Sequence, residues 1–127
     1  MIDLSIFARA ILKLEEAINM DKTEIVRDSV VQRFEYTYEL SISIIRRYIL
    51  EKYISDKVDI YVFQDVIRTA LQLEIIKSDL EKWSEFRKLR NKTSHTYNEK
   101  IAEDVYQIAK VFLEEVKFVY KAIQSKL

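Results

Sequence analysis

Apolar residues spaced three and four positions apart recur along the chain, which is the spacing of helices with one buried face. The first such stretch ends near Asn19–Met20, and its apolar positions are Leu4, Phe7, Ile11, Leu14 and Ile18. The letters DKTE follow at positions 21–24. They are typical of a capping box that starts the next helix, with Asp21 as the N-cap and Glu24 three residues later.

The second predicted helix is long and runs to about Tyr53, with apolar residues on more than one side. One stripe carries Val31, Phe34, Tyr38, Ser41, Ile45 and Tyr48, and a neighbouring set carries Val30, Ile42, Ile44 and Ile49. A helix of this kind must be covered by several neighbours. We therefore expect it at the centre of a bundle or on a subunit interface.

Three further helices complete the predicted order. Ser55–Asp59 is the expected loop, and Asp59 can cap a third helix over about Ile60–Leu73. The letters SDLE at 78–81 predict a second capping box and a shorter fourth helix, and Asn98 can cap the final helix. The apolar positions are Val62, Val66, Ala70 and Leu73, then Leu80, Trp83, Phe86 and Leu89, and finally Ile101, Val105, Ile108, Phe112, Val116, Val119 and Ile123.

Composition supports an all-α fold. The 127 residues include no glycine and no proline, and without these residues tight hairpins and left-handed turns are difficult to build. The length fits one domain, 1–127. We predict an antiparallel up-down helical bundle of four main helices plus one short helix.

Other features of the composition exclude several classes of function. The chain has no cysteine and one histidine, so disulfides, thiolate sites and a multi-histidine metal site within one subunit are excluded. We expect no metal and no cofactor. No membrane span is visible, and we expect a cytoplasmic location. The 21 basic and 21 acidic residues cancel, so any case for nucleic-acid binding must rest on local charge.

One segment is locally basic. Between positions 82 and 92 the charged residues are Lys82, Glu85, Arg87, Lys88, Arg90 and Lys92. A run of this kind is compatible with a solvated helix face. It is also compatible with a site for an anion such as phosphate.

His95 lies just after this basic segment. A histidine with its unperturbed pKa of about 6.5 suits proton transfer near neutral pH, and an arginine can hold phosphate through its planar donors. Together Arg90 and His95 could cleave RNA without a metal ion, and a two-fold dimer would supply a second histidine. Five residues turn a helix by about 500°, which leaves these two side chains roughly 140° apart. If they act together, the helix must end or distort between them.

The whole segment LRNKTSHTYNEK, at 89–100, closely resembles the signature of the HepT-like branch of the HEPN superfamily, earlier described as nucleotidyltransferase substrate-binding proteins. The segment RDSVVQRFEYTYEL, at 27–40, is similar to the second-helix block of that family. The resemblance implies a small helical bundle that forms a two-fold dimer. It also implies a partner, a minimal nucleotidyltransferase of the MNT type.

In toxin–antitoxin members of that family, the HEPN protein is a ribonuclease toxin, and the partner silences it by attaching AMP to the tyrosine of the signature. Carried over by position, the resemblance implies that Arg90 holds phosphate and His95 is the acid/base. It further implies that Asn91 orders the turn and that Tyr97 is the target of nucleotidylation. RNA is then the expected substrate.

Some alternatives remain open from the residues alone. Arg33, Glu35 and Glu39 can form pairs along the helix edge, line the cleft beside His95, or join the dimer interface. The chain can be the ribonuclease, a non-catalytic nucleotide- or substrate-binding subunit of a nucleotidyltransferase complex, or a structural dimerisation bundle. All three predict a homodimer, because the second helix carries more apolar surface than one bundle is expected to cover.

Overall fold

A computed structural model describes residues 2–52 and 59–127, and all regular structure in these ranges is helical. The helices are α1 (Ser5–Ile18), α2 (Glu24–Lys52), α3 (Phe63–Gln72), α4 (Leu80–His95) and α5 (Glu99–Lys126). The predicted all-α bundle is confirmed, although α3 is the short helix and α4 is longer than expected. The predicted end of α2 near Tyr53 and most of the predicted loop at 55–59 lie outside the described residues.

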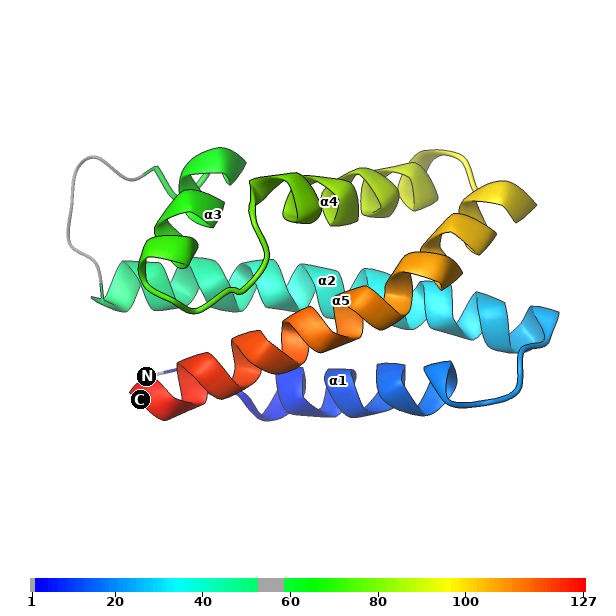
Figure 1. The fold of residues 1–127 in the computed structure, drawn as a ribbon, viewed down its shortest axis with the longest axis horizontal. Helices are drawn as coiled ribbons and strands as arrows, with labels where there is room; N and C mark the ends of the chain where they lie inside the picture. The colour runs from blue at the N-terminus through cyan, green and yellow to red at the C-terminus, as the bar shows by residue number, and fades with distance from the viewer. Residues whose placement is uncertain (1, 53–58) are drawn as a thin grey trace.

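The four longer helices run lengthwise, each antiparallel to the next, with α5 crossing diagonally over α2 (Figure 1). The short α3 packs at the end of α2 that is far from the α4–α5 connection. α2 contacts each of the other four helices. Its predicted central position is therefore confirmed.

Most apolar residues of α2 are covered within this one chain, although Ile25, Tyr36 and Leu50 are exposed. The predicted set is buried throughout: Val30, Val31, Phe34, Tyr38, Ser41, Ile42, Ile44, Ile45, Tyr48 and Ile49. Four neighbouring helices cover this set, so the excess apolar surface expected on α2 reduces to its three exposed residues. The homodimer itself stays a prediction.

An aromatic cluster fixes α4 against α2 and α5. The ring of Phe112 lies edge-on to Phe34 and Phe86, with centroids 4.8 and 5.1 Å apart, and Phe86 lies edge-on to Trp83 at 5.4 Å. All four side chains are fully buried. Edge-to-face pairs add to the stabilisation from area burial, so the helix that carries the candidate site is held rigidly along its buried side.

Two of the predicted helix caps were misplaced. The Thr23 hydroxyl, and not Asp21, accepts from the Val26 amide at the start of α2. Asp79, and not Ser78, accepts from the Lys82 amide at the start of α4. In each case the residue first expected as the cap suits that position by type about as well as the residue that caps, or better, so sequence alone could not choose. The Asn98 cap of α5 is confirmed by its bond from the Ile101 amide at 2.9 Å.

The third helix also differs from its prediction at both ends. It starts at Phe63, after a turn in which the Asp59 carboxylate accepts from the Tyr61 amide, and Val62 is 43% exposed. It ends with Glu74 in the left-handed region, at φ 60°. The amides of Glu74 and Ile75 bond back to the helix carbonyls of Leu71 and Ala70, as in a Schellman motif. A glutamate here occupies a position that usually favours glycine.

Candidate functional site

The candidate site lies where α4 ends, beside the beginnings of α2 and α5 (Figure 1). Arg90 and His95 both lie within α4, which continues unbroken to His95. The break that Arg90 and His95 would need in order to act together within one chain is therefore absent, and the chain leaves the helix only at Thr96. On a continuous helix the two side chains point about 140° apart. They consequently face different neighbours.

Arg90 faces α2. Its guanidinium lies 3.2 Å from a carboxylate oxygen of Glu35 and 3.2 Å from one of Glu39, and it also donates to the Ser94 hydroxyl. The side chain of Arg90 is 21% exposed. Two carboxylates thus neutralise and orient the guanidinium within a single chain. Any phosphate that binds Arg90 must compete with them or approach its remaining face.

His95 faces the opposite way and lines a groove between α4 and α5. This α4–α5 groove has a volume of about 580 Å³ and is formed by Ser84, Arg87, Lys88, Asn91, Lys92, His95, Thr96, Lys100, Ile101 and Asp104. Asn91 lies inside α4, one turn before His95, so it shares the groove face. The turn after α4 begins at Thr96, five residues beyond Asn91, and the expected role of Asn91 in ordering it stays a prediction.

The α4–α5 groove is positively charged. Arg87, Lys88, Lys92 and Lys100 line it, against the single carboxylate of Asp104, which pairs with Lys100 at 3.0 Å. Three residues of the predicted basic segment are thus gathered on one wall beside His95. A groove with several cations and one carboxylate suits a polyanion such as a nucleic-acid backbone.

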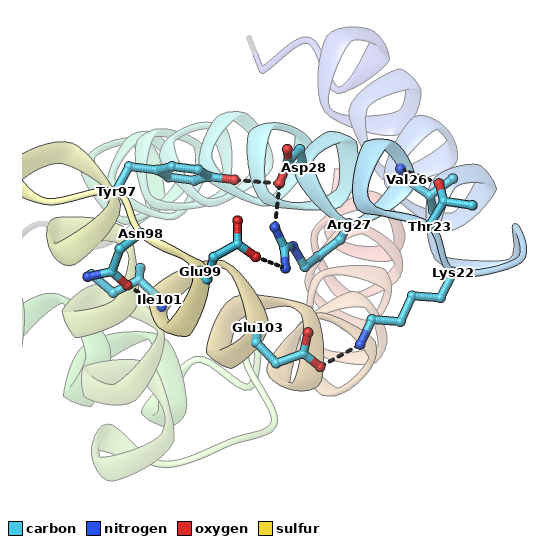
Figure 2. Close-up of polar contacts among 10 residues, drawn as sticks. All are labelled: Lys22, Thr23, Val26, Arg27, Asp28, Tyr97, Asn98, Glu99, Ile101 and Glu103. Atoms are coloured by element: carbon cyan, nitrogen blue, oxygen red, sulfur yellow. Dashed lines mark hydrogen bonds and ion pairs between the residues drawn. The ribbon is translucent and has the colours of Figure 1, made fainter.

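Tyr97 lies on the α4–α5 connection and points toward α2 (Figure 2). Its hydroxyl donates to the Asp28 carboxylate at 2.7 Å. Arg27 lies 3.3 Å from the same Asp28 oxygen and 2.7 Å from a carboxylate oxygen of Glu99. Burial, followed by the hydrogen bond to Asp28, raises the pKa of Tyr97 to about 12. The phenol is therefore protonated at neutral pH, although its side chain is 52% exposed.

Asp28, Glu35 and Glu39 belong to one face of α2. Offsets of seven and four residues keep side chains within about 40° of one another around a helix. This acidic row binds Tyr97 through Asp28 and Arg90 through Glu35 and Glu39. Arg33 lies outside the row, because its guanidinium donates to the Lys13 carbonyl of α1.

The structure therefore divides the predicted site into two parts. Arg90 and Tyr97 meet the acidic row of α2, while Asn91 and His95 line the α4–α5 groove. Sequence reasoning missed the role of Asp28, which lies within the 27–40 block but contacts a tyrosine 69 residues away. No local pattern marks such a contact.

Two classes of feature are absent from the described ranges 2–52 and 59–127. No group of three or more His, Cys, Asp or Glu side chains is arranged so that it could hold a metal ion. No helix there combines the length and the apolar character needed to cross a membrane.

Comparison with known proteins identifies relatives over nearly the whole chain. Residues 2–125 match the family described as nucleotidyltransferase substrate binding protein like. A probable ribonuclease HepT from Haemophilus influenzae is 36% identical over 107 residues, which cover 80% of this chain and 73% of that protein.

Two solved structures share the fold. One, from Haemophilus influenzae, is described as revealing the fold of a substrate binding domain of a nucleotidyltransferase. It has a TM-score of 0.82 and 30% identity, and the match covers 96% of this chain and 99% of the other. The second is a protein from Thermus thermophilus, with a TM-score of 0.72 and 26% identity. The match covers 89% of this chain and 94% of the other.

Proposed function

This chain belongs to the nucleotidyltransferase substrate-binding-protein-like family, in its HepT-like branch, and from that premise we propose that it is a ribonuclease built around His95. We propose further that it is the toxin of a toxin–antitoxin pair acting in the cytoplasm. Its antitoxin would be a minimal nucleotidyltransferase that modifies Tyr97.

The observation that carries this proposal is the position of the one histidine. His95 is exposed and lines the α4–α5 groove among four cationic side chains. The cations would bind the RNA backbone, and the imidazole would take or give the proton of a ribose hydroxyl or leaving oxygen. Arg90 would stabilise the charge that develops on phosphorus. This chemistry needs no metal ion.

The divided geometry makes a dimer part of the proposal. Within one chain Arg90 and His95 face different neighbours, and one histidine cannot readily serve as both acid and base. A two-fold axis near the end of α4 would place two copies of His95 across one cleft. Sedimentation at micromolar concentration tests this step, and a monomer that still cleaves RNA would contradict it.

The location of Tyr97 supports its proposed control. Tyr97 and Arg90 contact the same acidic row of α2, at Asp28 and Glu35, which are separated by roughly 10 Å along the helix. A nucleotide attached to the Tyr97 hydroxyl is long enough to span that separation. Its phosphate and bulk would then block RNA from Arg90.

RNA cleavage by the purified chain tests the proposed activity. We expect His95→Ala and Arg90→Ala each to slow cleavage of a single-stranded RNA by about 10²-fold or more. Arg68→Ala, which removes an exposed arginine of α3 outside the groove, is the matched control. Undiminished cleavage by both Arg90→Ala and His95→Ala would overturn the proposal.

A second function is favoured by a different observation. Two carboxylates already bind Arg90, which suits a non-catalytic subunit that presents nucleotide or substrate to a nucleotidyltransferase. Expressing the chain without its partner separates the two functions. Growth arrest that His95→Ala relieves supports the ribonuclease. A stable complex with the partner, without arrest or RNA cleavage, supports the binding subunit.

A further inference from the structure

The contact between Tyr97 and Asp28 joins two distant parts of the chain at the surface. The phenol hydroxyl lies 2.7 Å from Asp28 Oδ1, within direct proton-transfer distance. Tyr97 is 52% exposed and the Asp28 side chain is 45% exposed. A bound enzyme could therefore bring a nucleotide to the hydroxyl while the carboxylate stays in place. Figure 2 shows the ring reaching from the α4–α5 connection across to α2.

We propose that Asp28 is the base for the nucleotidylation of Tyr97, so that the modified protein supplies part of the catalytic machinery for its own modification. This inference rests on the proposed modification of Tyr97. The co-reactant is a nucleoside triphosphate with Mg²⁺, held by the partner nucleotidyltransferase.

Atoms and charge balance in this transfer. Tyr97 Oη attacks the α-phosphorus and forms a new P–O bond. The bond from that phosphorus to the oxygen that bridges the α- and β-phosphates breaks, and pyrophosphate leaves. The phenol proton passes to Asp28 Oδ1. Tyrosine is a weak nucleophile until it loses this proton.

The need for a base follows from the state of the phenol. With a pKa of about 12, raised by burial and then by the Asp28 contact, very little of Tyr97 ionises spontaneously at neutral pH. The carboxylate that stabilises the protonated phenol is also aligned to accept its proton during attack. The charged groups facing the phenol are Asp28 and Arg27 from α2 and Glu99 from α5.

Arg27 acts as a positioning residue in this arrangement. It links Asp28 to Glu99 at the start of α5, and its side chain is 11% exposed. The hydrogen bond to Glu99 raises the pKa of Arg27, so the guanidinium stays charged. When Asp28 takes the proton it loses its charge. Arg27 is then left as the cation beside the new phosphodiester. The neutral Asp28 no longer repels the negative charge of that phosphodiester.

The test is the rate at which the partner nucleotidyltransferase, with ATP and Mg²⁺, attaches AMP to the purified chain, followed by intact mass. Asp28→Asn keeps the size and can still accept the phenol hydrogen bond, but it is a far weaker base. We expect it to slow modification about 10²-fold at neutral pH. Asp28→Glu keeps a carboxylate, and we expect its rate of modification to be at least about tenfold higher than that of Asp28→Asn.

Two controls accompany this measurement. Glu85→Gln removes a carboxylate of nearly equal exposure, 47%, that also pairs with one cation, Lys82. It is expected to leave the rate unchanged. Tyr97→Phe is expected to abolish modification. Thermal unfolding shows whether each variant is folded. Because Asp28 is half-exposed, we expect its substitution to change the melting temperature little.

The pH profile separates a base from a contact that only holds the ring. Removing the Asp28 charge lowers the pKa of Tyr97, although burial, the larger cause of the shift, keeps it above its ordinary value of about 10. The defect of Asp28→Asn should therefore shrink as the pH rises from neutral to above about 10, because a growing fraction of the phenol ionises by itself. A defect that stays constant over that range would assign Asp28 a purely positional role and overturn the inference.

The remaining outcomes are also decisive. An equal or faster rate for Asp28→Asn would mean that Asp28 merely suppresses ionisation, and it would overturn this inference while leaving the proposed control intact. Absence of AMP from the wild-type chain would overturn the proposed control and this inference with it.

Discussion

The two ends of α4 both carry polar clusters, and the two clusters differ in burial. Near its beginning, the Glu115 carboxylate from α5 is 3% exposed. It accepts from the amides of Lys77 and Ser78, the Ser78 hydroxyl and the Trp83 indole, at 2.7–3.2 Å. Every donor that contacts this carboxylate is neutral. The cluster therefore joins α5 to the start of α4, and both carboxylate oxygens of Glu115 already accept hydrogen bonds.

The cluster at the end of α4 is half-exposed and charged. Arg90 is bound by Glu35 and Glu39, Tyr97 is bound by Asp28, and His95 lines the α4–α5 groove. Unlike Glu115, these groups are accessible to solvent. A saturated and buried carboxylate thus stabilises the fold. Exposed carboxylates beside an arginine and a phenol can instead control reactivity.

The largest effect is expected at the buried end. Glu115→Ala leaves two backbone amides and the Trp83 indole without an acceptor, and we expect it to lower the free energy of unfolding by about 3–5 kcal/mol. Glu114→Ala, at the next position of α5 with a 72% exposed side chain, is the matched control. It should change stability by less than about 0.5 kcal/mol. Urea unfolding measures both, and equal losses would contradict the assigned role of Glu115.

A smaller effect is expected at the exposed end, where Glu35 and Glu39 compete with phosphate for Arg90. In a His95→Ala background, in which we expect no cleavage, the double change Glu35→Gln and Glu39→Gln should tighten single-stranded RNA binding about three- to tenfold at low salt. Binding should also become more salt-dependent, because one more cation meets the phosphates.

The matched control for that experiment lies elsewhere on the surface. Lys117 is also held by two carboxylates, those of Glu15 and Glu114. Changing both to glutamine removes the same charge far from Arg90. If this control tightens RNA binding equally, the gain is a general charge effect and does not come from Arg90.

The smallest effect concerns the connection that leads into the buried end. Glu74, at φ 60°, is the one non-glycine residue with positive φ in the described parts of the chain. Glycine adopts this conformation without strain, although it also loses more entropy on folding. We expect Glu74→Gly to raise the free energy of unfolding by about 0.5–1 kcal/mol, measured by urea unfolding. A loss of stability would show that the glutamate side chain supports the turn.

Much of the fold could be predicted from the chain, because the spacing of apolar residues reports directly which side of each helix is buried. Phe34, Trp83 and Phe112 were placed on the buried side and are fully buried. Caps were less certain, since Asp21 and Thr23, or Ser78 and Asp79, are nearly equivalent by type. The third helix starts at Phe63, later than the predicted Ile60, because the Asp59 turn takes the place of its expected first residues.

The candidate site was predictable in its residue types but not in its geometry. The signature at 89–100 identified Arg90, Asn91, His95 and Tyr97, and their assigned roles remain proposals. The unbroken α4 could not be anticipated, because Ser and Thr hydroxyls can either disturb a helix or bond back within it. The Thr93 and Ser94 hydroxyls donate to the Arg90 carbonyl at 2.8 and 3.3 Å.

By itself the sequence determined that this protein is helical, most of the residues that enter its core and that the candidate site residues gather before α5, since these properties depend on local spacing and residue type. Only the tertiary structure decided that α2 presents Asp28 to Tyr97 and Glu35 and Glu39 to Arg90, and that His95 faces the groove instead. These contacts join residues that lie about 50 to 70 positions apart. They are formed only when the packed core fixes the rotation of each helix about its axis.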